Sequence, residues 1–327
     1  MARVFSGIQP TGDLHLGNYL GAVRRWAAEQ HEHDAIHCVV DLHALTIPRD
    51  PAELRAKTNE VTLLLVAAGL DPQAMILFAQ SHVPEHTELA WVMECTASHG
   101  ELSRMVQFKE KSKQAAHVSA GLFTYPALQA ADVLLYDTEE VPVGDDQRQH
   151  IELARDLAER FNGRYGPTFV VPKHTIPPVG ARIMDLQEPT KKMSKSLDSP
   201  QGTILVLDDP KAIERKIKRA VTDSDGEVRY DITEKPGLAN LLSILAAVTD
   251  EQPEAVAEKY TQYGPLKADA AAAVVEALRP LQERYAELAA DPGAADAILR
   301  TGAEKARAIA TPKMAQVRDA VGLTSRH

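Results

Sequence analysis

The sequence predicts an α/β protein, with a Rossmann-like parallel sheet in the first part of the chain and a mostly helical second part. Short β-rich runs alternate with helical stretches up to about residue 205, a pattern typical of a parallel sheet with helices on both faces. The run 35–41 is nearly all apolar, as expected for a strand buried on both faces. From residue 210 onward helical patterns dominate. We therefore expect an α/β domain over 1–205 and a helical domain over 206–327.

Strands are expected in the first part at 4–6, 35–41, 75–79 and 140–143. The first leads through a glycine-bearing turn into a helix over 19–30, which has apolar residues at helical spacing. After the second strand, Asp50 and Pro51 suit the start of a helix that Gly69 closes. A further helix is expected at about 147–161. Right-handed crossovers between parallel strands place a ligand crevice at the carboxyl ends of the strands.

Composition and charge narrow the class of protein. The 327 residues are 44% hydrophobic and 25% charged, which suits a globular chain of two domains. The net charge of −10 excludes a uniformly basic nucleic-acid coat but permits a local basic patch. The cysteines, Cys38 and Cys95, are too few for a disulfide scaffold or for a four-cysteine zinc or iron–sulfur site. The apolar runs are too short to span a bilayer, so we expect a soluble, cytoplasmic protein.

Two segments have residues suited to phosphate. The turn 7–18 carries glycines before a helix N-terminus, where free N–H groups meet anions. It is not a Walker A loop, because Asp13 stands where that motif has Lys, and an ordinary strand–helix turn explains it equally well. The segment 190–196 has three lysines between Pro189 and Pro200, and lysines neutralise charge that develops on a phosphate. Composition alone favours a solvated charge run there.

Together, the two segments resemble the paired signatures of class I aminoacyl-tRNA synthetases. His15-Leu16-Gly17-Asn18 is a variant of the first signature, with Asn18 in place of the final His, and Lys192-Met193-Ser194-Lys195-Ser196 is the complete second one. The variant, in the context 5–10, is similar to the tryptophanyl branch of the family. Further stretches that resemble bacterial members of this branch are 107–112, 131–136, 141–147 and 180–184.

The resemblance implies ATP-dependent activation of tryptophan to tryptophanyl-adenylate with release of pyrophosphate, followed by transfer to tRNA(Trp). Catalysis would be mainly positioning and charge stabilisation, because the amino-acid carboxylate itself attacks the α-phosphate. The residues implied to act at the phosphates are His15, Asn18, Lys111, Lys192 and Lys195. Those implied to bind ATP are Gln9, Pro10, Thr11, Gly17, Asn18, Gly144, Asp145, Asp146, Ile183, Lys192, Met193, Ser194, Lys195 and Ser196.

Within the ATP set, the resemblance implies narrower roles. Gly17 would let the adenine lie against the backbone, which a Cβ would obstruct. Gly144 and Asp146 would meet the ribose, and Ile183 and Met193 the adenine. Mg²⁺ would be carried on the phosphates, without an all-protein metal site.

The resemblance also implies a tryptophan pocket. Asp132 would accept the indole N–H, while Tyr125 and Gln147 would bind the ammonium group. Indole has one donor and no acceptor, so a buried carboxylate is a good selector; the alternative for Asp132 is a carboxylate on a helix surface. The apolar slot would be lined by Phe5, Val40, His43, Val141 and Val143. Gln129 stands where many relatives have Met, which bears on the fine shape of the pocket.

Two basic segments could contact tRNA phosphates, although a solvated amphipathic helix explains each equally well. The first holds Arg104, Lys109, Lys111 and Lys113, and the second holds Lys211, Arg215, Lys216, Lys218 and Arg219, with Ile213 and Ile217 four residues apart. The resemblance implies that the helical second half reads the anticodon. It also implies a homodimer, with the tRNA crossing from one subunit to the other.

Other functions compete with this one. A tyrosine–tRNA ligase shares the fold, but a phenol needs both a donor and an acceptor. A small-molecule adenylyltransferase needs no long helical second half, and a regulatory paralogue would not need intact His15, Lys192 and Lys195. The spacing His82-Val83-Pro84-Glu85-His86 matches that of some zinc peptidases, but Pro84 disfavours the single helix on which both His would have to lie.

Overall fold

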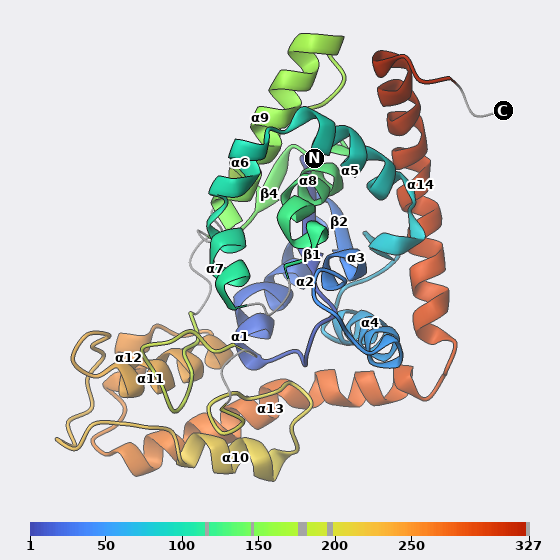
Figure 1. Cartoon of the computed structure of the whole chain (residues 1–327). Coiled ribbons are helices and arrows are strands. Elements are labelled where there is room, and N and C mark those ends of the chain that lie inside the picture. The colour runs from blue at the N-terminus through green and yellow to red at the C-terminus, as the bar shows by residue number, and fades with distance from the viewer. Residues whose placement is uncertain (115–117, 145–146, 176–181, 195–198, 325–327) are drawn as a thin grey trace.

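The computed structural model describes residues 1–114, 118–144, 147–175, 182–194 and 199–324, apart from the side chains of Lys111 and Gln114 (Figure 1). Its centre is a parallel sheet with the order β3-β2-β1-β4-β5. The strands are β1 (Arg3–Ile8), β2 (Asp34–Val39), β3 (Ile76–Ala79), β4 (Glu140–Pro142) and β5 (Lys173–Thr175). This sheet and the helices around it confirm the Rossmann-like α/β class. The predicted strands correspond to β1 to β4, whereas β5 was not predicted.

The first crossover begins in the glycine-bearing turn. It consists of α1 (Leu16–Asn18), a π-helical turn η1 (Tyr19–Val23) and α2 (Arg24–Glu29), which follow one another without a break. After β2 come α3 (Asp41–Ala44) and α4 (Pro51–Ala67). Asp50 caps α4 as predicted, because its carboxylate accepts a hydrogen bond of 2.9 Å from the N–H of Glu53. Gly69 follows α4 with a φ of +107°, a conformation that favours glycine.

The other face of the sheet is covered by α5, α8 and α9. Side chains of these helices and of the strands beneath them form one hydrophobic cluster, which includes Phe78, Leu134 and Phe161. The elements on this side are η2 (Gln80–His82), α5 (Glu85–Thr96), α6 (His99–Arg104), α7 (Val106–Gln114), α8 (Ala120–Leu134) and α9 (Arg148–Tyr165). The helix expected at 147–161 is α9, which extends four residues further.

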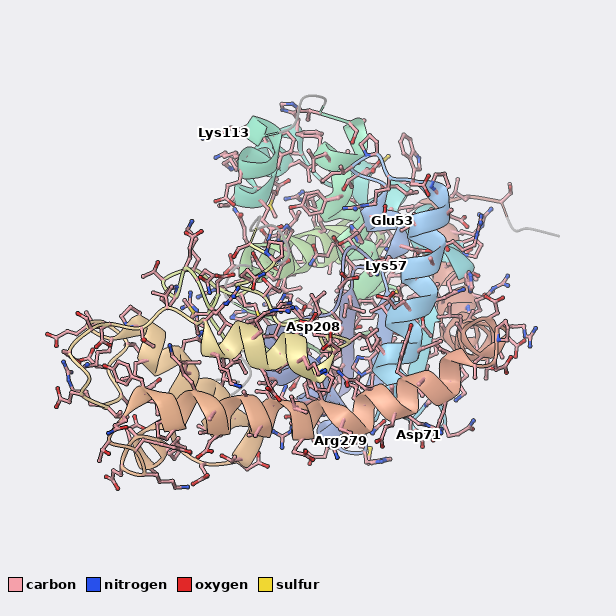
Figure 2. All side chains as sticks on the ribbon, turned by 90° about the horizontal axis from the view of Figure 1, so that it is seen from below. Glu53, Lys57, Asp71, Lys113, Asp208 and Arg279 are labelled. Carbon is pink, nitrogen blue, oxygen red and sulfur yellow. The ribbon has the colours of Figure 1, made fainter. Side chains whose placement is uncertain are left out.

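The second part of the chain is helical, as predicted. Its helices are α10 (Pro210–Lys218), α11 (Pro236–Thr249), α12 (Pro253–Ala257), α13 (Tyr263–Ala289) and α14 (Ala294–Val321). Figure 1 shows α10 to α13 gathered beneath the sheet, and Figure 2 views them from below, with Asp208 before α10 and Arg279 on α13. Within this group α13 packs against α10 and α11. It also packs against α4, which belongs to the first part of the chain. No helix in the described ranges combines the length and apolar character needed to cross a bilayer.

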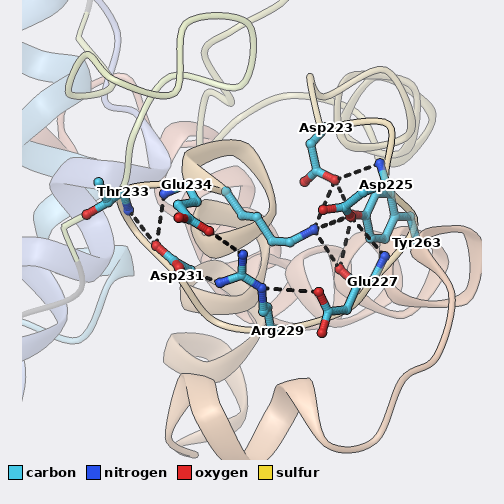
Figure 3. Close-up of polar contacts among 9 residues, drawn as sticks. Asp223, Asp225, Glu227, Arg229, Asp231, Thr233, Glu234 and Tyr263 are labelled. Carbon is cyan, nitrogen blue, oxygen red and sulfur yellow. Dashed lines mark hydrogen bonds and ion pairs between the residues drawn. The ribbon is translucent and has the colours of Figure 1, made fainter.

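The loop between α10 and α11 is organised around one buried ammonium group. Lys235 is 1% exposed and donates to Asp223 Oδ1 (3.0 Å), to Asp225, to the carbonyl oxygen of Glu227 (3.0 Å) and to Tyr263 Oη (3.1 Å). Figure 3 shows these acceptors converging from the loop and from α13. The ion pairs therefore hold the loop together, and the hydroxyl of Tyr263 joins it to α13.

Helix α14 does not stay with the other helices of the second part but returns to the edge of the sheet (Figure 1). It packs against β3, α4 and α5, and contributes Ala306, Ala310 and Met314 to the same cluster as Phe78. The approach is close at Gly302: a Cβ built there would lie 1.7 Å from the carbonyl oxygen of Leu77 in β3. Glycine is required at this position because the helix backbone lies directly on the strand.

We expect Gly302→Ala to lower the free energy of unfolding by about 1–3 kcal/mol, because α14 must move away from β3 to admit the methyl group. Gly163→Ala in α9 is a matched control, since nothing lies within 4 Å of its Cβ position. Because Gly163 lies in the last turn of α9, that control should leave the free energy of unfolding unchanged or raise it by up to about 1 kcal/mol. Urea denaturation followed by circular dichroism measures both. Equal behaviour of the two variants would contradict the close packing at Gly302.

Candidate active site

A cavity of about 480 Å³ opens at the carboxyl ends of β1, β2 and β4. This is where parallel α/β sheets bind ligands, because the chain leaves β1 and β4 in different directions there. All the residues predicted for the tryptophan pocket line this cavity: Phe5, Val40, His43, Tyr125, Gln129, Asp132, Val141, Val143 and Gln147. Gln9 and Gly144 of the ATP set line it as well. The structure thus brings together side chains from β1, β4, α8 and the segments that follow β2 and β4.

Asp132 lines the cavity and is 1% exposed, so its carboxylate belongs to a deeply buried part of the cavity wall. Its Oδ2 accepts from His43 Nε2 at 2.8 Å, and its Oδ1 accepts from Gln80 Nε2 and from His86 Nδ1, both at 2.6 Å. A buried carboxylate is tolerated only when such donors replace water. The alternative of a carboxylate on a helix surface is therefore excluded.

The donors also set the ionisation of Asp132. Burial raises the pKa of this carboxyl, but the hydrogen bonds and electrostatic attraction from His43 and His86 lower it by more, so the pKa lies below its ordinary value. Asp132 is ionised at neutral pH and can only accept hydrogen bonds. This part of the cavity wall therefore selects a ligand that presents a donor.

Gln80 and His86 hold Asp132 but were not identified in the sequence. His86 belongs to the spacing that resembled a zinc peptidase, yet His82 lies in η2 and His86 in α5, with Pro84 between the two elements. Both nitrogens of the His86 ring are used within the protein, one by Asp132 and the other by Tyr136 Oη at 2.7 Å. A lone histidine on a helix gives no sequence signal for such a contact.

The more open part of the cavity is polar. Tyr125 Oη lies 2.7 Å from His150 Nε2, which fixes the phenol at the cavity wall. Gln107, from the segment before α8, and Gln147, from the segment after it, also line the cavity. Burial raises the pKa of Tyr125, so its hydroxyl keeps its proton. The arrangement suits the polar end of an amino acid, with the apolar slot between this region and Asp132.

The first signature forms a capped turn at the start of α1. His15 Nδ1 accepts from the N–H of Asn18 at 3.2 Å, and the N–H of Leu16 donates to the carbonyl of Ile204 at 2.8 Å. At Gly17 a Cβ would meet the His15 ring at 3.1 Å and Ile183 at 3.6 Å. A side chain at this position would therefore press on the His15 ring, whatever the place of the adenine.

The second signature approaches the same turn. The N–H of Met193 donates to the carbonyl of Ile183 at 3.0 Å, and the Met193 side chain is buried. Lys192 is exposed, and its backbone forms a bridge with Met184. Ser194 accepts at its carbonyl from Thr203. Predicted residues that lie outside the described part of the chain are Asp145, Asp146, Lys195 and Ser196, together with the side chain of Lys111.

Comparison with known proteins decides the family. The model of the class I tRNA synthetases for tryptophan and tyrosine matches residues 1–279. The chain belongs to this family. It is 57% identical to tryptophan–tRNA ligase 1 of Streptomyces coelicolor, over 99% of the chain and 98% of that protein. It is 51% identical to the tryptophan–tRNA ligase of Caldanaerobacter subterraneus over the whole of both chains.

Solved structures agree with this assignment. The tryptophanyl-tRNA synthetase of Mycoplasma pneumoniae superposes with a TM-score of 0.92 at 35% identity, covering 99% of each chain. The Campylobacter jejuni synthetase complexed with ADP and tryptophan has a TM-score of 0.86 at 34% identity, covering 98% of this chain and all of that one. The similarity extends through the helical second part of the synthetase.

The two basic segments of the synthetase lie on different parts of the molecule. Lys113 of α7 is far from α10 in Figure 2. In α10, Ile213 and Ile217 are buried while Lys211, Arg215 and Lys218 are exposed, so the helix is amphipathic as predicted. Lys216 is the exception. It is buried and donates to the Thr203 carbonyl at 2.8 Å and to Asp208 at 2.6 Å, so neither a phosphate contact nor a solvated position describes this lysine.

Proposed function

We infer that this synthetase is a tryptophan–tRNA ligase, which activates L-tryptophan with ATP and transfers it to tRNA(Trp). The observation that carries the inference is the buried, ionised Asp132 in the wall of a cavity that Phe5, Val40, Val141 and Val143 also line. Indole offers one N–H donor and no acceptor, which suits a carboxylate. The near-full-length relatives reported above support tryptophan over tyrosine.

In the first step, an oxygen of the tryptophan carboxylate bonds to the α-phosphorus of ATP, and the bond from that phosphorus to the bridging oxygen of the β-phosphate breaks. Tryptophanyl-adenylate and pyrophosphate result, without a protein nucleophile. Most of the acceleration then comes from holding the two substrates in line and stabilising charge on the phosphates. We assign the amino-acid end to Tyr125 and Gln147, which line the open part of the cavity.

We assign the nucleotide to the two signatures. His15 and Asn18 would bind the phosphates at the helix start, and Lys192, Lys195 and Lys111 would neutralise charge on the leaving pyrophosphate. Mg²⁺ would enter on the phosphates, since this ion prefers phosphate oxygens and water to an all-protein cage. The remaining ATP contacts are proposed for Gln9, Pro10, Thr11, Gly17, Gly144, Asp145, Asp146, Ile183, Met193, Ser194 and Ser196.

The second part of the chain, 206–327, is proposed to bind the tRNA anticodon, with the exposed lysines and arginines of α10 near phosphates. We propose a cytoplasmic homodimer. Trp91 on α5 is 67% exposed, and we place it in the proposed subunit contact. Light scattering should give twice the chain mass of 35.7 kDa, and a monomer would contradict this proposal.

Aminoacylation tests the complete function. With ATP, labelled tryptophan should become attached to a tRNA(Trp) transcript, and a tRNA(Tyr) transcript of matched length serves as the control. Charging of tRNA(Tyr) with tyrosine would favour the competing ligase. Formation of adenylate without charging of either tRNA would favour a small-molecule adenylyltransferase.

A further inference from the structure

The hydrogen bonds to Asp132 leave one position on its carboxylate open. Each carboxylate oxygen has room for about two donors. Oδ1 already accepts from Gln80 and His86, whereas among the described residues only His43 donates to Oδ2. Because Asp132 lines the cavity, the open position for a ligand donor is on Oδ2.

The two side chains that donate to Oδ1, Gln80 and His86, are themselves oriented by further hydrogen bonds within the protein. Gln80 Oε1 accepts from the N–H of Leu42 at 3.2 Å, which leaves the Gln80 amino group to face Asp132. His86 must donate from Nδ1, because an ionised carboxylate only accepts. In the neutral ring, Nε2 then accepts from Tyr136 Oη at 2.7 Å. Burial raises the pKa of Tyr136, so the phenol keeps the proton that it donates.

None of these supporting groups can reach a ligand directly. Gln80, His86 and Tyr136 are fully buried, and the residues that line the cavity include none of them. Tyr136 is packed in turn against Phe5, a wall residue of the apolar slot, with ring centroids 5.8 Å apart and an interplanar angle of 14°. His86 can therefore act on a ligand through Asp132, or through Tyr136 and Phe5, and only the first route bears on recognition of the indole N–H.

We propose that His86, held by Tyr136, is a positioning residue for tryptophan selectivity, because it fixes the Asp132 carboxylate so that the open position of Oδ2 faces the indole N–H. The proposal rests on the tryptophan–tRNA ligase function proposed above. It assigns to the His86–Tyr136 pair the task of keeping Oδ1 saturated and the carboxylate in one rotamer. Without the His86 donor, Oδ1 accepts only from Gln80 among the donors described above. The carboxylate is then less restrained and can leave the rotamer in which Oδ2 faces the indole N–H.

Selectivity for the indole N–H can be measured with a near-isosteric analogue. In β-(benzothien-3-yl)alanine a sulfur replaces the N–H, so the ratio of kcat/KM for tryptophan to that for the analogue in ATP–pyrophosphate exchange reports this one hydrogen bond. The wild-type ratio should be about ten to a hundred, as for a hydrogen bond to a charged group. General damage to the fold lowers both kcat/KM values and leaves the ratio unchanged.

We expect His86→Leu to lower the ratio by about fivefold or more. His86→Asn should restore the ratio to within about twofold of wild type, because its amide nitrogen can take the place of Nδ1. Tyr136→Phe, which removes a single hydroxyl, should lower the ratio by about two- to threefold. His82→Leu is the matched control: it makes the same change in an exposed residue of η2 and should alter neither kcat/KM value.

The outcomes separate this proposal from the function on which it rests. If His86→Leu lowers both kcat/KM values but keeps the wild-type ratio, His86 has only a structural role. If that variant does not fold, Tyr136→Phe decides, and an unchanged ratio in it overturns the proposal. If Asp132→Ala also keeps the wild-type ratio, Asp132 does not recognise the indole N–H and the proposal for His86 falls with it. If the wild type does not activate tryptophan, the proposed function itself fails.

Discussion

Replacing Lys192 with alanine should slow tryptophanyl-adenylate formation by about 10²–10³-fold in a single turnover. The backbone of Lys192 forms a bridge with Met184, and its side chain is exposed. It forms no ion pair with any residue in the described ranges, so its ammonium group is available to a phosphate. Lys192 should stabilise the charge that develops on the leaving pyrophosphate in the transition state more than it stabilises bound ATP, so its loss should slow the chemical step.

Stopped-flow measurement of adenylate formation, beside equilibrium binding of tryptophan without ATP, tests this expectation. Tryptophan affinity should hardly change, because the lysine acts at the phosphates. Lys191→Ala is the matched control, since Lys191 is equally exposed and is paired with Glu188. Lys195→Ala, outside the described residues, should resemble Lys192→Ala. Near-normal rates in both signature variants would contradict a role of this segment in the chemical step.

Replacing Asp132 with alanine should weaken tryptophan binding by about ten- to a hundredfold, because a hydrogen bond to a charged group contributes about 1.5–3 kcal/mol. ATP binding should persist, since the two signatures form a separate turn around His15 and Met193. The substitution also leaves His43, Gln80 and His86 without an acceptor, so the fold needs a check by thermal denaturation.

Isothermal titration with tryptophan and with ATP separates the two binding sites in this variant. Phenylalanine provides the control for selectivity, because it fills the slot but has no ring donor. An unchanged preference for tryptophan over phenylalanine in Asp132→Ala would show that the carboxylate does not recognise the indole.

Strands with a strong apolar run could be predicted from the sequence. The stretch that forms β2 is buried along nearly its whole length, and its composition showed this directly. In contrast, β5 consists of Lys173, His174 and Thr175, none of which is fully buried, so periodicity gave no signal. This segment is a strand because it pairs with β4. A short polar run gives no sign of such a pairing in the sequence.

The place of α14 could not be predicted either. Its Ala-rich pattern identifies a helix but does not say which surface that helix covers. Gly302 marks the contact with Leu77, although a glycine in a helix has several possible explanations before the structure is known. Likewise, Ile213 and Ile217 correctly predicted the buried face of α10, but the burial of Lys216 depends on Asp208 and Thr203, which lie before the helix.

At the site, the resemblance to a family predicted residues that line the cavity, whereas the residues that support Asp132 were found only in the structure. The residues expected around tryptophan come from separate segments, yet all of them line one cavity. Gln80 and His86 were missed because their partners lie 52 and 46 residues away along the chain, and only the fold brings them to Asp132. Supporting residues of this kind leave no local pattern in a single sequence.

Amino-acid-dependent ATP–pyrophosphate exchange, measured with each standard amino acid in turn, tests the central claim most directly. The claim is that the slot lined by Asp132 selects indole. Tryptophan alone should support strong exchange, with tyrosine and phenylalanine far below it. Stronger exchange with tyrosine than with tryptophan would contradict the account.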